Sequence, residues 1–238
     1  MRPLAALLLS ASVALLAACS RDATTPRTDA SAHAARPSEP TVGPTDPARR
    51  NAYYLSTCAL CNRPLGYIGP AIDHTHAGRP LRFCATSCVD RFLADPAAGL
   101  AHADAVMIAD QRPHYPPGPS IVSGRALGPA PVEIIWNNRL VRLADDDDRR
   151  AFLADPDRHL RALDDAVLAA QAPTYGMPTR CPVQGDILDD DVPIDIVIAS
   201  RMVRVCCQRC VRVVRARPYQ YLAMVDYANK EAAQRAAK

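Results

Sequence analysis

The chain of 238 residues has few aromatic residues, with three Phe and one Trp among an aromatic content of 5%. A single large hydrophobic core needs more bulky apolar side chains than this, so we expect several small folded units. Lysine occurs only twice, and the net charge of +3 is too small to indicate nucleic-acid binding. The sequence also has no Ser/His/Asp order, no glycine-rich phosphate loop and no carboxylate pair typical of catalysis, which argues against an enzyme.

Cysteine and proline, in contrast, are plentiful, with nine Cys and 22 Pro, and hydrophobic residues make up 49% of the chain. That hydrophobic content excludes a wholly disordered polymer. Small domains that lack a large core are commonly stabilised by a bound metal or by disulfides. The cysteines are therefore the candidates for such cross-links.

Residues 1–18 are predicted to form a signal peptide. Arg2 precedes two apolar runs, 4–9 and 11–18, which together are too short to span a bilayer. The segment Leu16-Ala17-Ala18-Cys19 resembles the lipobox of bacterial lipoproteins. That resemblance implies that Cys19 is lipid-modified and becomes the first mature residue, and the Ser that follows it is similar to the signal for outer-membrane delivery. The alternative is an ordinary secretory signal that ends in Cys.

Residues 19–50 are predicted to be the lipidated Cys followed by a disordered tether. This segment is rich in Pro, Thr, Ala and Ser and has no apolar periodicity. An acyl chain on Cys19 would anchor the protein to a leaflet without spanning it. The expected location is therefore the cell envelope, at the outer membrane and facing the periplasm, with the membrane and possibly an envelope protein as partners.

The remaining sequence repeats itself with a period of about 61 residues. We assign repeat 1 to residues 51–112, repeat 2 to 113–173 and repeat 3 to 174–238. The aligned landmarks are a Tyr near the start of each repeat and a later segment that ends in Pro: Tyr53, Tyr115 and Tyr175, and residues 83–96, 143–156 and 205–218. Self-similarity of this kind predicts three copies of one structural unit.

Each unit is expected to consist of a β-hairpin followed by two helices, which gives an α+β fold. In repeat 2, strands 132–136 and 139–143 flank the turn pair Asn137-Asn138, and repeat 3 copies this with strands 194–198 and 201–205. The first helix is predicted to end just before a proline. The second helix then begins with Asp95 or Asp155 as N-cap and a proline at the first helical position.

Repeat 1 contains two pairs of cysteines that can converge on one metal ion. Cys58 and Cys61 are separated by two residues, and Cys84 and Cys88 follow after a further 22 residues. Two such pairs supply four sulfurs around a tetrahedral ion. This pattern, with Phe83 before the second pair and a Phe-Leu-Ala-Asp-Pro run after it, resembles the TRASH/YHS metal-binding family. The resemblance implies tandem treble-clef-like units and a role in trafficking, resistance to, or sensing of heavy metals.

The other two repeats depart from this pattern. Repeat 2 has no cysteine, so we expect it to bind no metal and to act as a packing unit between its neighbours. Its four ligand positions hold Ser120, Ser123, Ala144 and Asp148, and we expect Asp148→Ser to leave the repeat intact. Repeat 3 keeps Cys181, Cys206 and Cys210, with Gln184 at the fourth position and an extra Cys207 that we interpret as an ordinary thiol. Three thiolates with an open fourth position suit Cu(I), whereas a closed four-sulfur site favours Zn.

The sequence leaves three interpretations of the cysteines open. The leading one is binding of Zn or a soft metal such as Cu(I), for metal handling, trafficking or sensing without turnover. The second is a disulfide-stabilised or structurally zinc-bound module that docks an envelope partner, because thiols oxidise outside the cytoplasm. The third is thioredoxin-like redox chemistry at Cys58–Cys61, which needs a helix that opens at the first Cys. His74 and His76 are further candidate ligands, although a solvated strand edge explains them more simply.

Overall fold

A computed structural model of the protein describes residues 52–185, 187–188 and 193–238, all of which fall within one compact unit. Helices and small antiparallel sheets are both present, so the fold is α+β. The predicted signal peptide, the lipidation of Cys19 and the tether lie outside the described residues and stay predictions.

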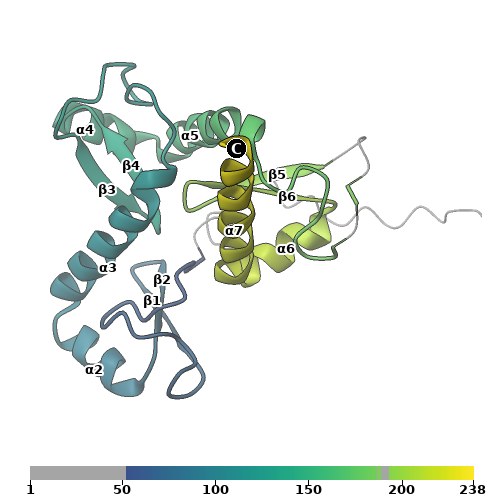
Figure 1. Cartoon of the computed structure of the whole chain (residues 1–238). Coiled ribbons are helices and arrows are strands. Elements are labelled where there is room, and N and C mark those ends of the chain that lie inside the picture. The colour runs from purple at the N-terminus through teal and green to yellow at the C-terminus, as the bar shows by residue number, and fades with distance from the viewer. Residues whose placement is uncertain (1–51, 186, 189–192) are drawn as a thin grey trace, which may run out of the picture. The chain divides into compact units, whose positions relative to one another are not determined.

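Three successive sets of a β-hairpin and two helices make up the described chain (Figure 1). The first set comprises β1 (Ile72–His76), β2 (Arg79–Phe83), α2 (Thr86–Ala94), α3 (Pro96–Gln111) and the 3-10 turn η1 (Arg112–His114). The second comprises β3 (Val132–Trp136), β4 (Arg139–Leu143), α4 (Asp146–Ala154), α5 (Pro156–Gln171) and η2 (Ala172–Thr174). The third comprises β5 (Ile194–Ile198), β6 (Arg201–Val205), α6 (Gln208–Ala216) and α7 (Pro218–Ala236).

The hairpins predicted for repeats 2 and 3 are confirmed, and the hairpin of repeat 1 has the same length and register. In each hairpin both turn residues have positive φ, as a two-residue type I′ turn requires. Asn137 and Asn138 adopt this conformation readily, whereas Ala199 and Ser200 adopt it without help from glycine or asparagine. The turn conformation is therefore a property of the unit and not only of the local residues.

The predicted helix starts are also confirmed in repeats 1 and 2. The carboxylate of Asp95 accepts a hydrogen bond from the N–H of Ala98, and that of Asp155 accepts one from Arg158. Each cap is followed by a proline at the first helical position. In repeat 3 Arg217 takes the capping position and makes no side-chain capping bond.

A buried arginine at the start of the second strand recurs in every repeat and was not recognised in the sequence. Each one pairs with an aspartate that lies 25 residues later, on the second helix of the same repeat. The pairs are Arg79–Asp104, Arg139–Asp164 and Arg201–Asp226. Burial of a guanidinium requires such a partner, so these pairs fix the hairpin against the helix in each unit.

The buried residues form two cores. One contains residues from both repeat 1 and repeat 3, and the other lies within repeat 2. Repeats 1 and 3 also contact each other directly, through the ion pair of Asp110 with Arg201 and the hydrogen bond of Ser200 with Gln111. Repeat 2 packs against both neighbours, through the hydrogen bonds of Arg79 with Asn138 and of Gln171 with Ser200, but it does not separate them.

Gln111, the last residue of α3, joins all three repeats and is fully buried. Its amide nitrogen donates to the Tyr54 hydroxyl and to the carbonyl of Asn138, at 3.0 and 3.1 Å. Its amide oxygen accepts from the N–H of Leu140 at 3.0 Å and from the Ser200 hydroxyl at 3.3 Å. Gln171, at the end of α5, binds the hairpin of repeat 3 in the same way.

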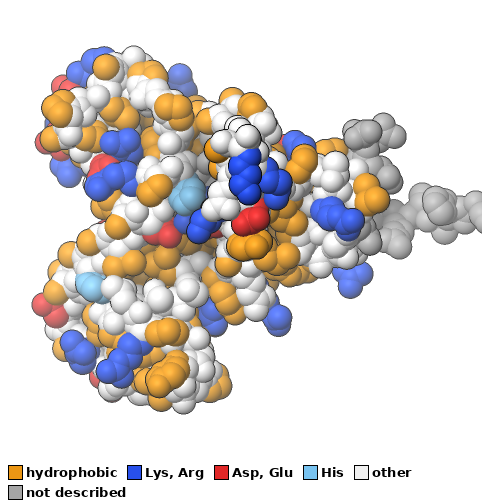
Figure 2. All heavy atoms as spheres, viewed as in Figure 1, with side chains coloured by type: hydrophobic (Ala, Val, Ile, Leu, Met, Phe, Trp, Pro, Cys, Tyr) orange, Lys and Arg blue, Asp and Glu red, His pale blue; other side chains and the backbone are white. Residues whose placement is uncertain are grey.

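Charged side chains are scattered over the face of the molecule in Figure 2. Figure 2 shows Lys and Arg side chains on separate parts of the face drawn, with apolar and neutral side chains between them. Every helix in the described part of the chain is too short or too polar to cross a membrane.

Candidate metal centre

A tight turn presents the first cysteine pair of repeat 1. The N–H of Asn62 donates to the carbonyl of Cys58, and the N–H of Cys58 donates to the carbonyl of Arg63. Asn62 has a positive φ of 56°, which closes the turn. The same turn occurs in the other repeats, where Gly124 and Gly185 have positive φ and donate to the carbonyls of Ser120 and Cys181. The turn of repeat 2 therefore forms without any cysteine, and in all three repeats an Asn or Gly takes the positive φ.

The second pair comes from the start of α2. Cys84 follows the last residue of β2, and Cys88 lies in the first turn of the helix. The hairpin brings this helix start against the turn of the first pair, through the bond from the N–H of Ala59 to the carbonyl of Arg82, in β2. Cys58, Cys84 and Cys88 are at most 7% exposed, and Cys61 is partly exposed.

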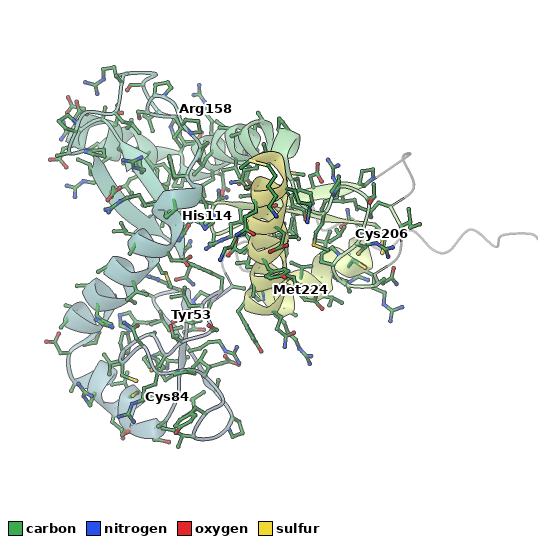
Figure 3. The ribbon with its side chains drawn as sticks, viewed as in Figure 1. Tyr53, Cys84, His114, Arg158, Cys206 and Met224 are labelled. Atoms are coloured by element: carbon green, nitrogen blue, oxygen red, sulfur yellow. The ribbon has the colours of Figure 1, made fainter. Side chains whose placement is uncertain are left out.

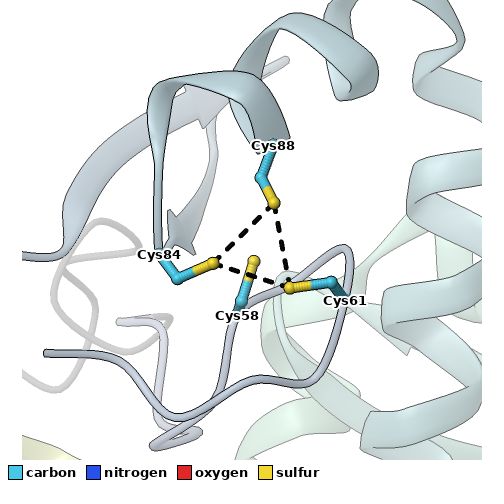
Figure 4. A group of neighbouring side chains, drawn as sticks. All are labelled: Cys58, Cys61, Cys84 and Cys88. Carbon is cyan, nitrogen blue, oxygen red and sulfur yellow. Dashed lines mark hydrogen bonds between the residues drawn. The ribbon is translucent and has the colours of Figure 1, made fainter. Parts of the chain in front are cut away.

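The four sulfur atoms of repeat 1 lie within 4.8 Å of one another. The Sγ atoms of Cys61 and Cys84 are 3.5 Å apart, and that of Cys88 lies 3.8 Å from each of them. Figure 4 shows the Sγ of Cys58 facing these three. Four ligands at a Zn–S distance of about 2.3 Å in a tetrahedron lie about 3.8 Å apart. The sulfur spacing therefore fits a four-thiolate ion, with shifts of a few tenths of an ångström.

The protonation of these thiols depends on their surroundings. Burial alone would raise the pKa of Cys58, but the N–H groups of Leu60, Cys84 and Cys61 donate to its sulfur and lower that pKa below its usual value. Burial raises the pKa of Cys88 to about 12. Binding of a metal ion would thus release protons, because the ligand is the thiolate.

None of the eight cysteines in the described residues is disulfide-bonded. The separation of 3.5 Å between the Sγ atoms of Cys61 and Cys84 is far longer than an S–S bond of about 2.05 Å. The thioredoxin interpretation also fails, because Cys58 and Cys61 lie in a turn and the nearest described helix begins only at Thr86.

His74 and His76 do not join the sulfur cluster. Both imidazoles pack edge-on against the ring of Phe92, at centroid distances of 5.7 and 5.3 Å, and His74 also contacts Phe83. The two histidines are only partly exposed in this aromatic group, whereas Asp73 and Thr75 are exposed, so the interpretation of a solvated strand edge applies to the other face of β1.

Repeat 3 brings three of its cysteines together in the same way. The Sγ atoms of Cys181, Cys206 and Cys210 lie within 4.8 Å of one another. Gln184 stands at the fourth position, and its amide oxygen accepts a hydrogen bond from the Cys206 thiol at 3.1 Å. Figure 3 shows Cys84 and Cys206 at the corresponding place in the two repeats, just before the first helix. The site offers three sulfurs and one neutral oxygen.

Backbone N–H groups surround the first sulfur of repeat 3 as they do in repeat 1. Burial alone would raise the pKa of Cys181, but the N–H groups of Cys206, Gln184 and Val183 lower it. Burial raises the pKa of Cys206 to about 11. In both sites, therefore, backbone N–H donors lower the pKa of the first cysteine.

Repeat 2 fills the corresponding place with hydrogen bonds. The carboxylate of Asp148, at the position of Cys88, accepts from the hydroxyl of Ser123 and the N–H of Ala144 and pairs with Arg125. Burial would raise the pKa of Asp148, but its hydrogen bonds with Ser120, Arg125, Ala144 and Ser123 lower it to about 2. A buried anion with satisfied partners thus stands where repeat 1 gathers four sulfurs.

This network contradicts the expectation that Asp148→Ser is harmless. We expect the substitution to lower the free energy of unfolding of repeat 2 by about 2–3 kcal/mol at neutral pH, because a carboxyl whose pKa falls from about 3.9 to about 2 on folding contributes that energy. The folded-state pKa is lowered, so the contribution is full above the unfolded pKa of about 3.9 and disappears as the pH falls through about 2. Urea unfolding from pH 7 to pH 2 measures it.

Asp146→Ser is the matched control, because Asp146 lies in the same helical turn but is two-thirds exposed and pairs only with Arg149. Its effect should stay within about 0.5 kcal/mol. Equal losses from the two substitutions, or a loss from Asp148→Ser that persists at pH 2, would contradict the role assigned to this carboxylate.

Comparisons with protein-family models, with curated proteins and with solved structures find no match to this chain. The geometry of the described residues provides two cysteine groups that could hold a metal ion.

Proposed function

We propose that this protein binds a thiophilic metal ion, Zn²⁺ or Cu(I), through Cys58, Cys61, Cys84 and Cys88, and a second ion through Cys181, Cys206 and Cys210. Its role would be metal handling, trafficking or sensing, with no catalytic turnover. The observation that carries the proposal is the convergence of four sulfurs from two distant segments at separations that suit a tetrahedral ion.

The two sites differ in the ion they favour. Repeat 1 offers four buried or partly buried thiolates, a closed donor set that retains Zn²⁺. Repeat 3 offers three thiolates and an amide oxygen, and soft three-coordinate Cu(I) takes sulfur in preference to that oxygen. We infer that repeat 1 holds its ion for folding and that repeat 3 exchanges its ion.

The arrangement within repeats 1 and 3 supports a treble-clef-like description. A turn carries the first sulfur or pair, a hairpin follows, and the first turn of a helix carries the second pair. The motif spacing that resembles the TRASH/YHS family points to the same description. We further propose that the protein works in the cell envelope, anchored by a lipid on Cys19, and this part of the proposal rests on the sequence of the first 20 residues alone.

Elemental analysis combined with thiol titration tests the proposal on the full chain purified without added metal or reductant. We expect at least one Zn or Cu ion per chain. After denaturation in the presence of a chelator, all eight cysteines other than Cys19 should react as free thiols.

A disulfide-stabilised interaction module would give the opposite result. It would contain no metal, and its cysteines would react only after a reductant is added. That outcome would overturn the proposed function. If the protein contains metal but the thiols of repeat 3 are oxidised, the proposed function is restricted to the repeat 1 site.

A further inference from the structure

Cys207 belongs to a second sulfur triangle in repeat 3. Its Sγ lies 3.8 Å from that of Cys206 and 3.7 Å from that of Cys210, and those two are 3.6 Å apart. The group that includes Cys181 also contains Cys206 and Cys210 but not Cys207. Two triangles therefore share the edge between Cys206 and Cys210, with Cys181 on one side and Cys207 on the other.

The second triangle has the size that a three-coordinate ion needs. In an equilateral triangle the distance from the centre to a corner is the side divided by the square root of three. An ion at the centre of this triangle, with sides of about 3.7 Å, would therefore lie about 2.1 Å from each sulfur. Metal–thiolate bonds are about 2.3 Å long, so a small displacement of the ion or the sulfurs completes the fit. Three thiolates without a fourth ligand suit Cu(I) better than Zn²⁺.

The two triangles differ in their access to solvent. Cys181 is fully buried, whereas Cys206 and Cys207 are partly exposed, and Cys210, which both triangles share, is 1% exposed. We call Cys181, Cys206 and Cys210 the inner triangle and Cys206, Cys207 and Cys210 the outer triangle. An ion that arrives from solvent reaches the outer triangle first.

We propose that the outer triangle is an entry site for Cu(I) and that the ion passes from it to the inner triangle. In the transfer the metal–sulfur bond to Cys207 breaks and a bond to Cys181 forms, while Cys206 and Cys210 stay bound. The Cys181 thiolate replaces the Cys207 thiolate at the ion, so the charge of the site does not change, and copper stays monovalent throughout. The inference rests on the proposed function of repeat 3.

Repeat 1 provides an internal comparison. Ala85 occupies the position that corresponds to Cys207, so repeat 1 has no fifth sulfur and no second triangle. Repeat 1 therefore has no second group of three sulfurs onto which its ion could move. This agrees with an ion that stays bound in repeat 1.

The test supplies Cu(I) in a coloured chelator complex to the full chain under anaerobic conditions and follows the loss of colour, with bound Cu and Zn measured after desalting. In Cys207→Ser we expect the same final copper content as in the unsubstituted protein, but capture at least tenfold slower. In Cys181→Ser we expect rapid capture but retention at least tenfold weaker against the chelator. Gln208→Ser, next to Cys207 and exposed, should change neither quantity.

Two results would overturn the entry site: capture by Cys207→Ser at the unsubstituted rate, or loss of its final copper content. Cys207 is partly exposed, so this substitution leaves the fold intact, as retained zinc in repeat 1 would verify. Failure of the proposed function looks different, because the unsubstituted protein would then take up no copper beyond the ion of repeat 1.

Discussion

Cys84→Ser is expected to remove the metal from repeat 1 and to unfold that repeat. A structural zinc ion contributes on the order of 10 kcal/mol to a small module, which is as much as the whole stability of a typical domain. The large aromatic side chains of the core near the site are few, namely Tyr53, Tyr54, Phe83 and Phe92. Metal content should fall by one ion per chain, and amide hydrogen exchange in residues 58–94 should accelerate by at least 100-fold.

Ala144→Ser is the matched control, because Ala144 occupies the same position in repeat 2 and a serine there removes no sulfur. This variant should keep the metal and the exchange rates of the unsubstituted protein. If Cys84→Ser retains its ion and its slow exchange, the four-sulfur centre does not stabilise repeat 1.

Gln111→Leu is expected to lower the free energy of unfolding by about 3 kcal/mol. The leucine fills most of the space but removes the acceptor of the Leu140 N–H and of the Ser200 hydroxyl in a buried place. Each unpaired buried polar group costs about 1–3 kcal/mol. Urea denaturation at neutral pH measures the loss, and we expect it to affect all three repeats because Gln111 contacts each of them.

Gln234→Leu, on the exposed side of the last turns of α7, serves as the control and should change stability by less than about 0.5 kcal/mol. Gln171→Leu should have an intermediate effect, because Gln171 is half-buried and bonds one neighbouring hairpin. A Gln111→Leu protein as stable as the Gln234→Leu protein would show that the junction is not held by this amide.

Much of the local structure was predictable because its causes lie within a few residues. A turn pair between two β-branched runs predicted the hairpins, and an Asp-Pro step predicted the starts of α3 and α5. The cysteine spacing predicted which sulfurs share a centre, since a hairpin returns the chain to its starting point after a fixed number of residues.

Other features escaped prediction because they depend on contacts between distant segments. From the sequence, Asp148 is a residue that replaces a metal-binding cysteine and has no role of its own. Only the folded chain brings Ser123, Ala144 and Arg125 to its carboxylate. The junction at Gln111 left a faint signal, a Gln two residues before a proline that recurs at Gln171, but its partners in three repeats could not be inferred from it.

By itself, the sequence of this protein determined the repeated hairpin-and-helix unit and the membership of the cysteine groups, because both follow from short-range backbone geometry repeated with a fixed period. Tertiary structure alone decided that repeats 1 and 3 share a core, that a carboxylate network fills the corresponding place in repeat 2, and that Cys207 faces the pair Cys206 and Cys210. These features depend on where side chains point and on how segments far apart in the chain pack together. The spacing of residues along the sequence specifies neither of these.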